Sequence, residues 1–294
     1  MNFRTIGVIG IGNIGSSVVA DLVLHGLHAI AIDRDDAALE RARAEVLKAV
    51  RFAPLLLKGA PKLTRDDVLE RITFTTDIDA AAAGEFIIEN VTEDWAIKEP
   101  VYRQLEEIVP KHVCFGANTS CIPIARIAGA TRRPAKVVGM HLMNPVYLKP
   151  AVEVIRSRET SDHTLATVNA LFAQLKKEAL VVADSPGFVS NRISHLFMNE
   201  AICVLQEGIA PAAQIDAIFK KCFGHKMGPL ETADLIGLDT VMDSLDVLYE
   251  SFGDPKFRCC PLLREKVAAG ECGRKSGRGF YTYPEANLTS PTLP

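Results

Sequence analysis

Four side chains in this chain of 294 residues have the types needed to move a proton on a hydroxyl-bearing carbon: Ser120, His141, Glu153 and Asn191. Histidine titrates close to neutral pH, so it can accept a proton in one direction and return it in the other. Glu153 stands in the alternating run Ala151–Ile155, which predicts that it points inward, where a carboxylate needs a partner. We therefore predict that Glu153 orients His141 and that Ser120 and Asn191 hold a substrate oxygen.

A plainer interpretation of the same residues stays open. His141 could be a core histidine bonded to backbone, beside a solvated Glu153, and Asn191 could simply cap a helix. Cys121, next to Ser120, could suggest a thiol nucleophile, but no other feature of the sequence supplies a covalent step. Spacing alone does not decide between these interpretations and an acid–base pair.

The N-terminal region carries a glycine-rich motif at the end of an apolar run. A short apolar run ends at Gly10, and the spacing Gly-x-Gly-x-x-Gly then leads into a segment with helical periodicity. Gly10 permits a tight turn, Gly12 lets backbone approach a pyrophosphate, and Gly15 lets helix and strand pack closely. The new helix would also offer unpaired N–H groups to the phosphates. A proton acceptor and a hydride acceptor in one chain indicate a dehydrogenase.

The choice of dinucleotide depends on the end of the next apolar run. Asp33 follows that run, and its carboxylate would bind the adenosine ribose hydroxyls and repel a 2′-phosphate. NAD is therefore the predicted cofactor. Arg34 could soften the repulsion and allow NADP.

Composition excludes several classes of protein. Apolar residues make up 48% of the chain and charged residues 23%, and the net charge of −3 gives no reason to expect nucleic acid. No apolar run reaches the roughly 18 residues of a membrane span, and the N-terminus does not resemble a signal peptide, so we expect a cytoplasmic protein. Seven cysteines without CxxC spacing indicate neither a disulfide framework nor a metal site.

The periodicity changes once along the chain. Apolar runs and helical segments alternate up to Val182, which predicts a mainly parallel sheet covered on both faces. Only helical periodicity follows the turn-rich segment Asp184–Gly187. We predict an α/β fold with two domains: a Rossmann-type dinucleotide-binding domain, residues 1–185, and a smaller all-helical domain for substrate binding and dimerisation, residues 186–294. Pro54 should interrupt or kink a helix expected over Asp36–Leu57. A loose tail is expected after Pro284.

Seven motifs together resemble the L-3-hydroxyacyl-CoA dehydrogenase family, in particular its short 3-hydroxybutyryl-CoA dehydrogenases. The resemblance extends from the glycine loop to residues 273–281, and the motifs are Asn118–Ser120, Gly139–His141, Asn144–Pro145, Val152–Ile155, Pro186–Phe188, Asn191–Arg192 and Met227–Glu231. It implies oxidation of a 3-hydroxyacyl thioester by NAD, as in fatty acid metabolism, with His141 as base and Glu153 as its orienter. It also implies a homodimer formed through the helical domain.

The resemblance assigns further residues to binding. The dinucleotide would contact Gly10, Gly12, Asn13, Ile14, Gly15, Asp33, Glu93, Lys98, Asn118 and Asn144, and the substrate would contact Ser120, Asn191 and Lys58.

One departure from the family concerns the carrier of the acyl group. Family members tend to place basic and hydroxyl groups at the end of the second long helix, whereas here Phe52–Leu57 is apolar and only Lys48, Arg51 and Lys58 remain. The chain also resembles relatives in polyketide biosynthesis, which oxidise a hydroxyacyl group, such as glyceryl, on an acyl carrier protein. A basic run near the C-terminus could attract such an acidic carrier.

Two other functions are weighed against this one. The β-hydroxyacid dehydrogenases also join a glycine loop to a helical domain, but they use a lysine base. A non-catalytic nucleotide-binding protein would be expected to have degraded catalytic positions, and all four are intact.

Overall fold

The computed structural model describes residues 2–284. The chain divides into two compact units between Ser185 and Pro186, and each unit is described by itself. The expected tail, residues 285–294, lies outside the described residues. Among the helices that are described, none is both long enough and apolar enough to cross a membrane.

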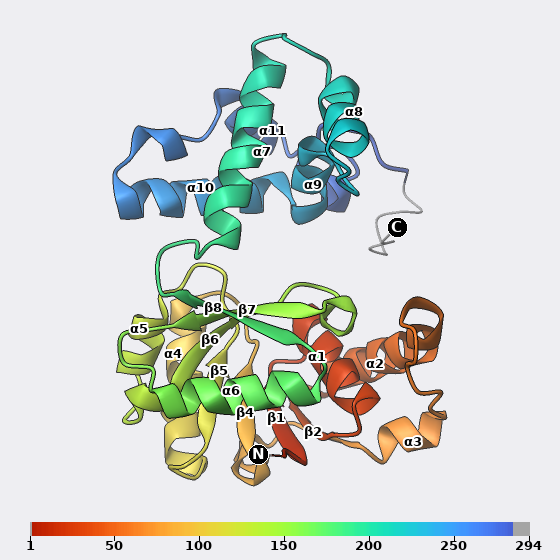
Figure 1. Cartoon of the computed structure of the whole chain (residues 1–294), viewed down its shortest axis with the longest axis vertical. Coiled ribbons are helices and arrows are strands. Elements are labelled where there is room, and N and C mark those ends of the chain that lie inside the picture. Colours follow the sequence, from red (N-terminus) through yellow and green to blue (C-terminus); the bar gives the residue numbers. More distant parts are fainter. Residues whose placement is uncertain (1, 285–294) are drawn as a thin grey trace. The chain divides into compact units, whose positions relative to one another are not determined.

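The first unit is built on one sheet of eight strands in the order β3-β2-β1-β4-β5-β6-β7-β8 (Figure 1). The strands are β1 (Thr5–Ile9), β2 (His28–Ile32), β3 (Ile72–Thr75), β4 (Phe86–Glu89), β5 (Cys114–Ala117), β6 (Val137–His141), β7 (Ala151–Arg156) and β8 (Glu178–Ala183). Neighbouring strands from β3 to β6 run parallel, β7 runs antiparallel to β6, and β8 runs parallel to β7. The prediction of a mainly parallel sheet is confirmed.

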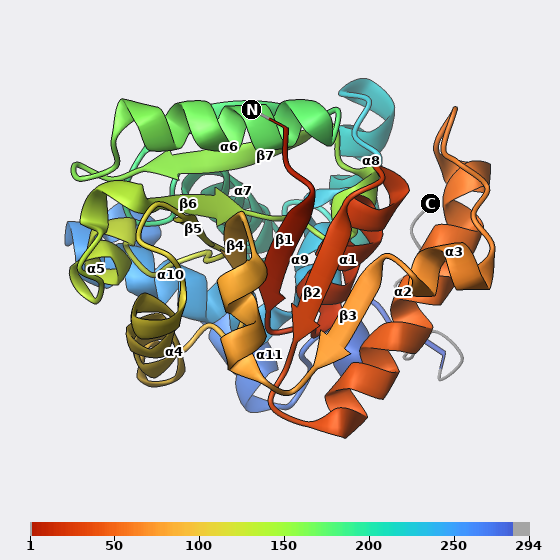
Figure 2. The same ribbon diagram turned by 90° about the horizontal axis from the view of Figure 1, so that it is seen from below.

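The central strands form because their residues are apolar on both faces. All four residues of β4 and of β5 are buried, as expected for parallel strands covered by helices. Helices lie on both sides of the sheet (Figure 2). They are α1 (Asn13–Leu24), α2 (Asp36–Leu56), α3 (Arg65–Leu69), α4 (Trp95–Ile108), α5 (Ile124–Gly129) and α6 (Asp162–Gln174). The parallel strands therefore all end at one edge, where α/β sheets place their ligands.

Pro54 does not interrupt α2 where the sequence suggested. The helix continues past Pro54 and ends at Leu56. Pro54 has no N–H to donate to the Val50 carbonyl, and the helix ends two residues later, which is the early end that a proline favours.

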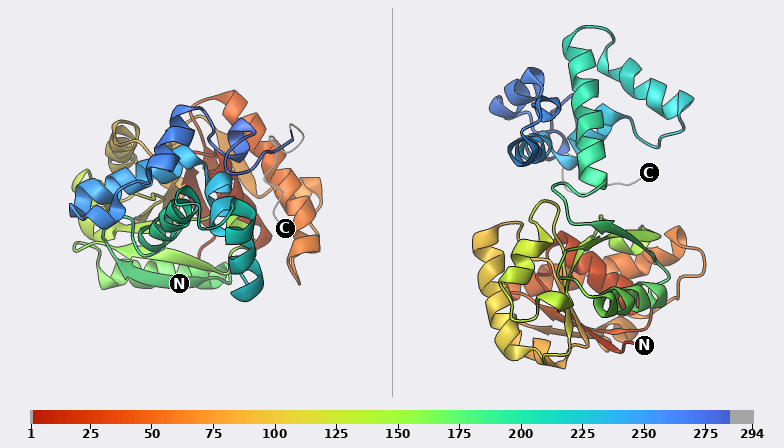
Figure 3. Two further views of the ribbon diagram at one scale, coloured as in Figure 1. Left: turned by 90° about the horizontal axis from the view of Figure 1, so that it is seen from above. Right: turned by 60° about the vertical axis from the view of Figure 1, so that its left-hand side comes forward.

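The second unit is helical, as predicted. Its helices are α7 (Ser190–Gln206), α8 (Ala212–Cys222), α9 (Pro229–Ile236), α10 (Leu238–Phe252) and α11 (Pro261–Ala268). The central helix α7 packs against the other four (Figure 3). The buried carboxylate of Asp234 accepts hydrogen bonds from the backbone of Phe280 and Tyr281 and from the Tyr283 hydroxyl, which attaches the chain after α11 to α9. Burial raises the pKa of the Asp234 carboxyl.

Candidate active site

His141 and Glu153 are cross-strand neighbours. His141 ends β6, Glu153 lies in β7, and the antiparallel register places the two residues opposite each other. His141 Nδ1 lies 2.9 Å from Glu153 Oε2, and each side chain is 9% exposed. If Nδ1 carries the proton and donates a hydrogen bond to the carboxylate, the lone pair of Nε2 is left as an acceptor. The pair therefore has the geometry of a general base with an orienting carboxylate.

Ser120 completes a chain of three polar side chains. It lies in the loop after β5, and its Oγ is 3.1 Å from His141 Nε2. Strand β5 is the direct neighbour of β6, so both side chains reach the same edge of the sheet. A substrate hydroxyl placed at this edge would meet a serine hydroxyl and a basic nitrogen together.

Glu93 holds the loop that carries Ser120. Its Oε1 accepts hydrogen bonds from Thr119 Oγ1 at 2.5 Å, from Ser120 N at 2.7 Å and from Cys121 N at 3.0 Å. Three donors on one oxygen fix the backbone of this loop. The sequence predicted Glu93 only as a dinucleotide contact, and this supporting role was not foreseen because the partners are 26 to 28 residues away.

Lys98 lies beneath this loop. Its side chain is 0% exposed and its Nζ donates to Glu89, at 2.8 Å from Oε1, and to the Asn118 carbonyl at 2.9 Å. Tyr102 donates its hydroxyl to Glu89 Oε2 at 2.8 Å. Burial raises the pKa of the Glu89 carboxyl and that of the Tyr102 hydroxyl. Lys98 has no exposed surface and holds the backbone of Asn118 through this hydrogen bond. A direct contact of Lys98 with the dinucleotide stays a prediction.

Two asparagines predicted to bind the cofactor lie at the same edge of the sheet. Asn118 follows β5, and its Oδ1 accepts a hydrogen bond from Leu142 N at 3.1 Å, which joins the ends of β5 and β6. Asn144 is exposed, and the Asn144–Pro145 peptide bond is cis.

The glycine loop has the shape that a dinucleotide requires. Gly10 has φ +79, and a Cβ there would lie 2.7 Å from Val91 N. A Cβ on Gly15 would lie 2.0 Å from the Gly10 carbonyl oxygen, so only glycine lets α1 start this close to β1. A Cβ on Gly12 would meet no atom within 4 Å, which leaves open space above the loop.

The start of α1 and the end of β2 complete the cofactor site. Gly12 is the N-cap of α1, no side chain caps the helix, and its first turn holds no acidic residue, so its N–H groups are available to phosphates. Asn13 and Ile14 form this first turn. Asp33 Oδ2 accepts a hydrogen bond from Ile11 N at 2.8 Å and Oδ1 accepts one from Arg34 N, which leaves lone pairs for ribose hydroxyls. These residues fit NAD.

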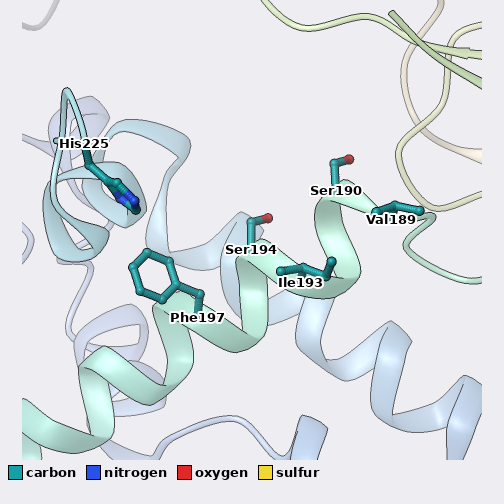
Figure 4. A pocket seen from close by; sticks show the side chains of 6 residues that line it. All are labelled: Val189, Ser190, Ile193, Ser194, Phe197 and His225. Carbon is teal, nitrogen blue, oxygen red and sulfur yellow. The ribbon is translucent and has the colours of Figure 1, made fainter. Parts of the chain in front are cut away.

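The remaining predicted substrate residues belong to other segments of the chain. Asn191 is in the first turn of α7, in the second unit, where its carbonyl oxygen accepts a hydrogen bond from His195 Nδ1 at 2.9 Å. The same helix lines an apolar hollow of about 460 Å³ (Figure 4), formed by Val189, Ser190, Ile193, Ser194, Phe197 and His225. Lys58 follows α2 and lines a hollow of about 230 Å³ in the first unit, together with Leu57 and Tyr147.

No group of three or more His, Cys, Asp or Glu side chains within residues 2–284 could hold a metal ion.

Comparison with known proteins agrees with this architecture. The model of the 3-hydroxyacyl-CoA dehydrogenase NAD-binding domain matches residues 5–185, and that of the C-terminal domain matches residues 187–283. A probable 3-hydroxybutyryl-CoA dehydrogenase of Deinococcus radiodurans is 42% identical over 94% of this chain and 99% of its own length. A probable 3-hydroxybutyryl-CoA dehydrogenase of Bacillus subtilis is 40% identical over 97% of this chain and 99% of its own. The crystal structure of (S)-3-hydroxybutyryl-CoA dehydrogenase from Ralstonia eutropha superimposes with a TM-score of 0.91, is 41% identical, and covers 97% of this chain and 100% of that one.

The fold and the glycine loop define an NAD-dependent oxidoreductase with a helical second unit. The chain belongs to the 3-hydroxyacyl-CoA dehydrogenase family.

Proposed function

We propose that the enzyme interconverts 3-hydroxyacyl and 3-oxoacyl thioesters, with His141 as the base that takes the proton from the C3 hydroxyl. The observation that supports this most is the chain from Ser120 Oγ to His141 Nε2 and from His141 Nδ1 to Glu153, at 3.1 and 2.9 Å. Oxidation of the alcohol removes one proton from oxygen and one hydride from carbon, and the proton is the part that these side chains handle. NADH formation from a 3-hydroxyacyl thioester is the direct assay.

Ser120, His141 and Glu153 have separate roles in the reaction. His141 Nε2 receives the hydroxyl proton, and the Ser120 hydroxyl hydrogen-bonds the same substrate oxygen. Glu153 keeps the proton on Nδ1 before the reaction and stabilises the imidazolium afterwards, because a buried positive charge needs a counter-charge. We assign Asn191 to the same substrate oxygen from the second unit. In the reverse direction the imidazolium returns the proton to the 3-oxo oxygen.

The dinucleotide is held by the glycine loop, Asn13, Ile14 and Asp33, and we extend its site to Glu93, Asn118 and Asn144. When bound, NAD supplies the acceptor for the hydride. Two contacts support this extension: Glu93 accepts a hydrogen bond from the backbone N–H of Ser120, and Asn118 accepts one from the backbone N–H of Leu142, directly after His141.

The names of the relatives point to a short acyl chain on coenzyme A. The probable enzymes from D. radiodurans and B. subtilis are both described as 3-hydroxybutyryl-CoA dehydrogenases. We propose a 3-hydroxybutyryl thioester as a substrate on this basis, with Lys58 near its carrier.

A second candidate is a hydroxyacyl group, such as glyceryl, on an acyl carrier protein of a polyketide pathway. The end of α2 supports it, because Leu55 is 80% exposed and Phe52 and Leu56 are also exposed. Lys48 and Arg51 precede this apolar patch on α2 and Lys58 follows it, with the Arg51 guanidinium 5.8 Å from the centre of the Phe52 ring and Lys48 Nζ 3.9 Å from Glu45. An apolar patch with a cationic rim suits an acidic protein surface better than a bare nucleotide.

The basic run near the C-terminus adds little to this second candidate. Most of its cations lie within 4 Å of a carboxylate of the same unit: Lys256 of Asp254, Arg264 of Asp246, Lys266 and Arg278 of Glu271, and Lys275 of Asp239. These pairs neutralise the run, so the prediction that it attracts an acidic carrier has weaker support than the patch on α2.

The two carriers can be distinguished with one acyl group presented on both. A carrier-protein substrate should show a kcat/KM well above that of its coenzyme A counterpart, and the advantage should fall as salt rises. Leu55→Ser should remove the advantage and leave turnover of the coenzyme A thioester unchanged. Equal or better turnover of the coenzyme A thioester by the wild-type enzyme would assign the enzyme to fatty-acid or butyrate metabolism.

We also propose that the second unit forms a homodimer, and that α7 supplies the interface. Ile193 is 63% exposed and Val189 is exposed beside it. A second apolar segment of this unit, Val241–Leu248, does not add to this surface, because Val241, Leu245 and Leu248 are buried in the core of the unit itself. Sedimentation at micromolar concentration should give the mass of a dimer, and Ile193→Asp should shift it toward the monomer. A monomeric wild-type protein would rule out this proposal.

A further inference from the structure

The segment that connects β6 to β7, residues 142–150, is attached to α1. The backbone N–H of Val146 donates to Ser17 Oγ at 2.7 Å. Lys177, directly before β8, donates from its Nζ to the Val146 carbonyl at 2.9 Å and to the Lys149 carbonyl at 2.7 Å. Both backbone groups of Val146 are thus bound to side chains from distant parts of the sequence.

Lys177 is buried together with a counter-ion from α1. Its Nζ lies 3.2 Å from Asp21 Oδ2, and the two side chains are 3% and 1% exposed. An ammonium has three protons, of which the carbonyls of Val146 and Lys149 accept two, and the Asp21 carboxylate supplies the opposite charge. His25 Nδ1 lies 3.3 Å from the other carboxylate oxygen of Asp21. Neither carboxylate oxygen of Asp21 has a hydrogen-bond partner among the described residues, so charge attraction pairs it with Lys177, while hydrogen bonds join Lys177 to the two carbonyls. The proposed mechanism uses none of these groups.

Helix α1 therefore serves two parts of the site. Its first turn belongs to the proposed binding site of the dinucleotide phosphates. Ser17 and Asp21, four residues apart, lie on one face of the helix, and this face contacts the connecting segment. The segment begins directly after His141 and contains Asn144. Its attachment sets how far the end of β6 lies from the helix that binds the dinucleotide.

We propose that Lys177 is a positioning residue for hydride transfer. Through Val146 and Lys149 it fixes the connecting segment on α1, and so fixes the base and the exposed Asn144 relative to the dinucleotide. This role rests on the proposed function of His141. A displacement of about 1 Å in a reacting geometry can cost about 10²-fold in rate.

Replacement of Lys177 by methionine keeps the stem and removes the ammonium. With active sites counted by NADH binding, Lys177→Met should lower kcat at least about 10-fold per site. The primary deuterium isotope effect on kcat, with deuterium on the carbon that carries the hydroxyl, should exceed that of the wild type, because the hydride step alone becomes slower. Lys111→Met changes an exposed lysine in the turn before β5 and should alter neither quantity.

A second variant separates positioning from stability. Asp21→Leu combined with Lys177→Met removes both buried charges, so the melting temperature should be closer to that of the wild type than in Lys177→Met alone. The carbonyls of Val146 and Lys149 still lack their donor, so the lower kcat and the larger isotope effect should persist. Ser17→Ala removes the other attachment without burying a charge and should change kcat in the same direction by a smaller factor.

Two outcomes would reject the role. The first is a double variant with wild-type kcat per active site and a wild-type isotope effect. The second, if both Lys177 variants fail to fold, is a Ser17→Ala enzyme with unchanged kcat and isotope effect. Full activity in a His141→Ala enzyme would instead reject the proposed base, so a failure of the proposed function can be distinguished from a failure of the Lys177 role alone.

Discussion

Replacement of His141 by alanine is expected to lower kcat about 10²–10⁴-fold, which is the usual contribution of a general base. NADH should bind as tightly as in the wild type, because His141 ends β6 and pairs with Ser120 and Glu153, whereas the glycine loop follows β1. Stopped-flow or steady-state NADH formation gives the first quantity, and NADH fluorescence titration gives the second. Retention of more than about half of the activity would remove His141 from the mechanism.

Glu153→Gln tests the other member of the pair and serves as the comparison variant. The amide keeps the shape of the side chain but offers no negative charge to the imidazolium. The charged form of His141 then loses its counter-charge, so the limb of the pH–rate profile that reports the base should move to lower pH, together with a lower maximal rate. A profile of unchanged position would show that Glu153 has only a structural role.

Asp33→Ser should weaken NAD binding by about 10- to 100-fold and narrow the gap between NAD and NADP. The reason is that hydrogen bonds to a charged group contribute about 1.5–3 kcal/mol, and serine offers neither the charge nor the second oxygen. The measurement is kcat/KM for both dinucleotides at fixed substrate. Arg34→Ala, on the adjacent residue, is the matched control for these two kcat/KM values. If the wild type already prefers NADP, then Arg34, whose side chain is 89% exposed, determines the choice and the assignment to Asp33 is wrong.

Much of the fold and of the candidate site could be predicted because the signals are local. Each signal is read from consecutive residues. They are the glycine spacing, the apolar runs of β1, β2 and β4, and the helical periodicity of the single helices after Ser185. The residue types of His141 and Glu153 suggested a pair even though their geometry was unknown. The structure adds the reason: the two residues are opposite each other in an antiparallel ladder.

The supporting residues could not be predicted because their partners are distant in sequence. The bond between Ser17 and Val146 spans 129 residues, and the bonds of Lys177 span 28 to 31. Lys98 illustrates a different limit. Its charge suggested a ligand contact, whereas the fold places it at zero exposure beside Glu89, and no local pattern distinguishes a buried lysine from a solvated one.

The antiparallel pairing of β6 and β7 also restricts how the length of the connection between them can change over evolution. Side chains on a strand alternate between the two faces, so a shift of one residue would turn Glu153 away and place Val152 or Val154 opposite His141. A change of one residue in the length of the connection between 142 and 150 would therefore separate the acid–base pair wherever it shifted this register instead of being absorbed in the connection or in a bulge. The loop from residue 57 to residue 64 joins α2 to α3 and sets no strand register, so its length is not restricted in this way. Relatives that keep the reaction should vary in length in that loop and stay uniform between the histidine and the glutamate.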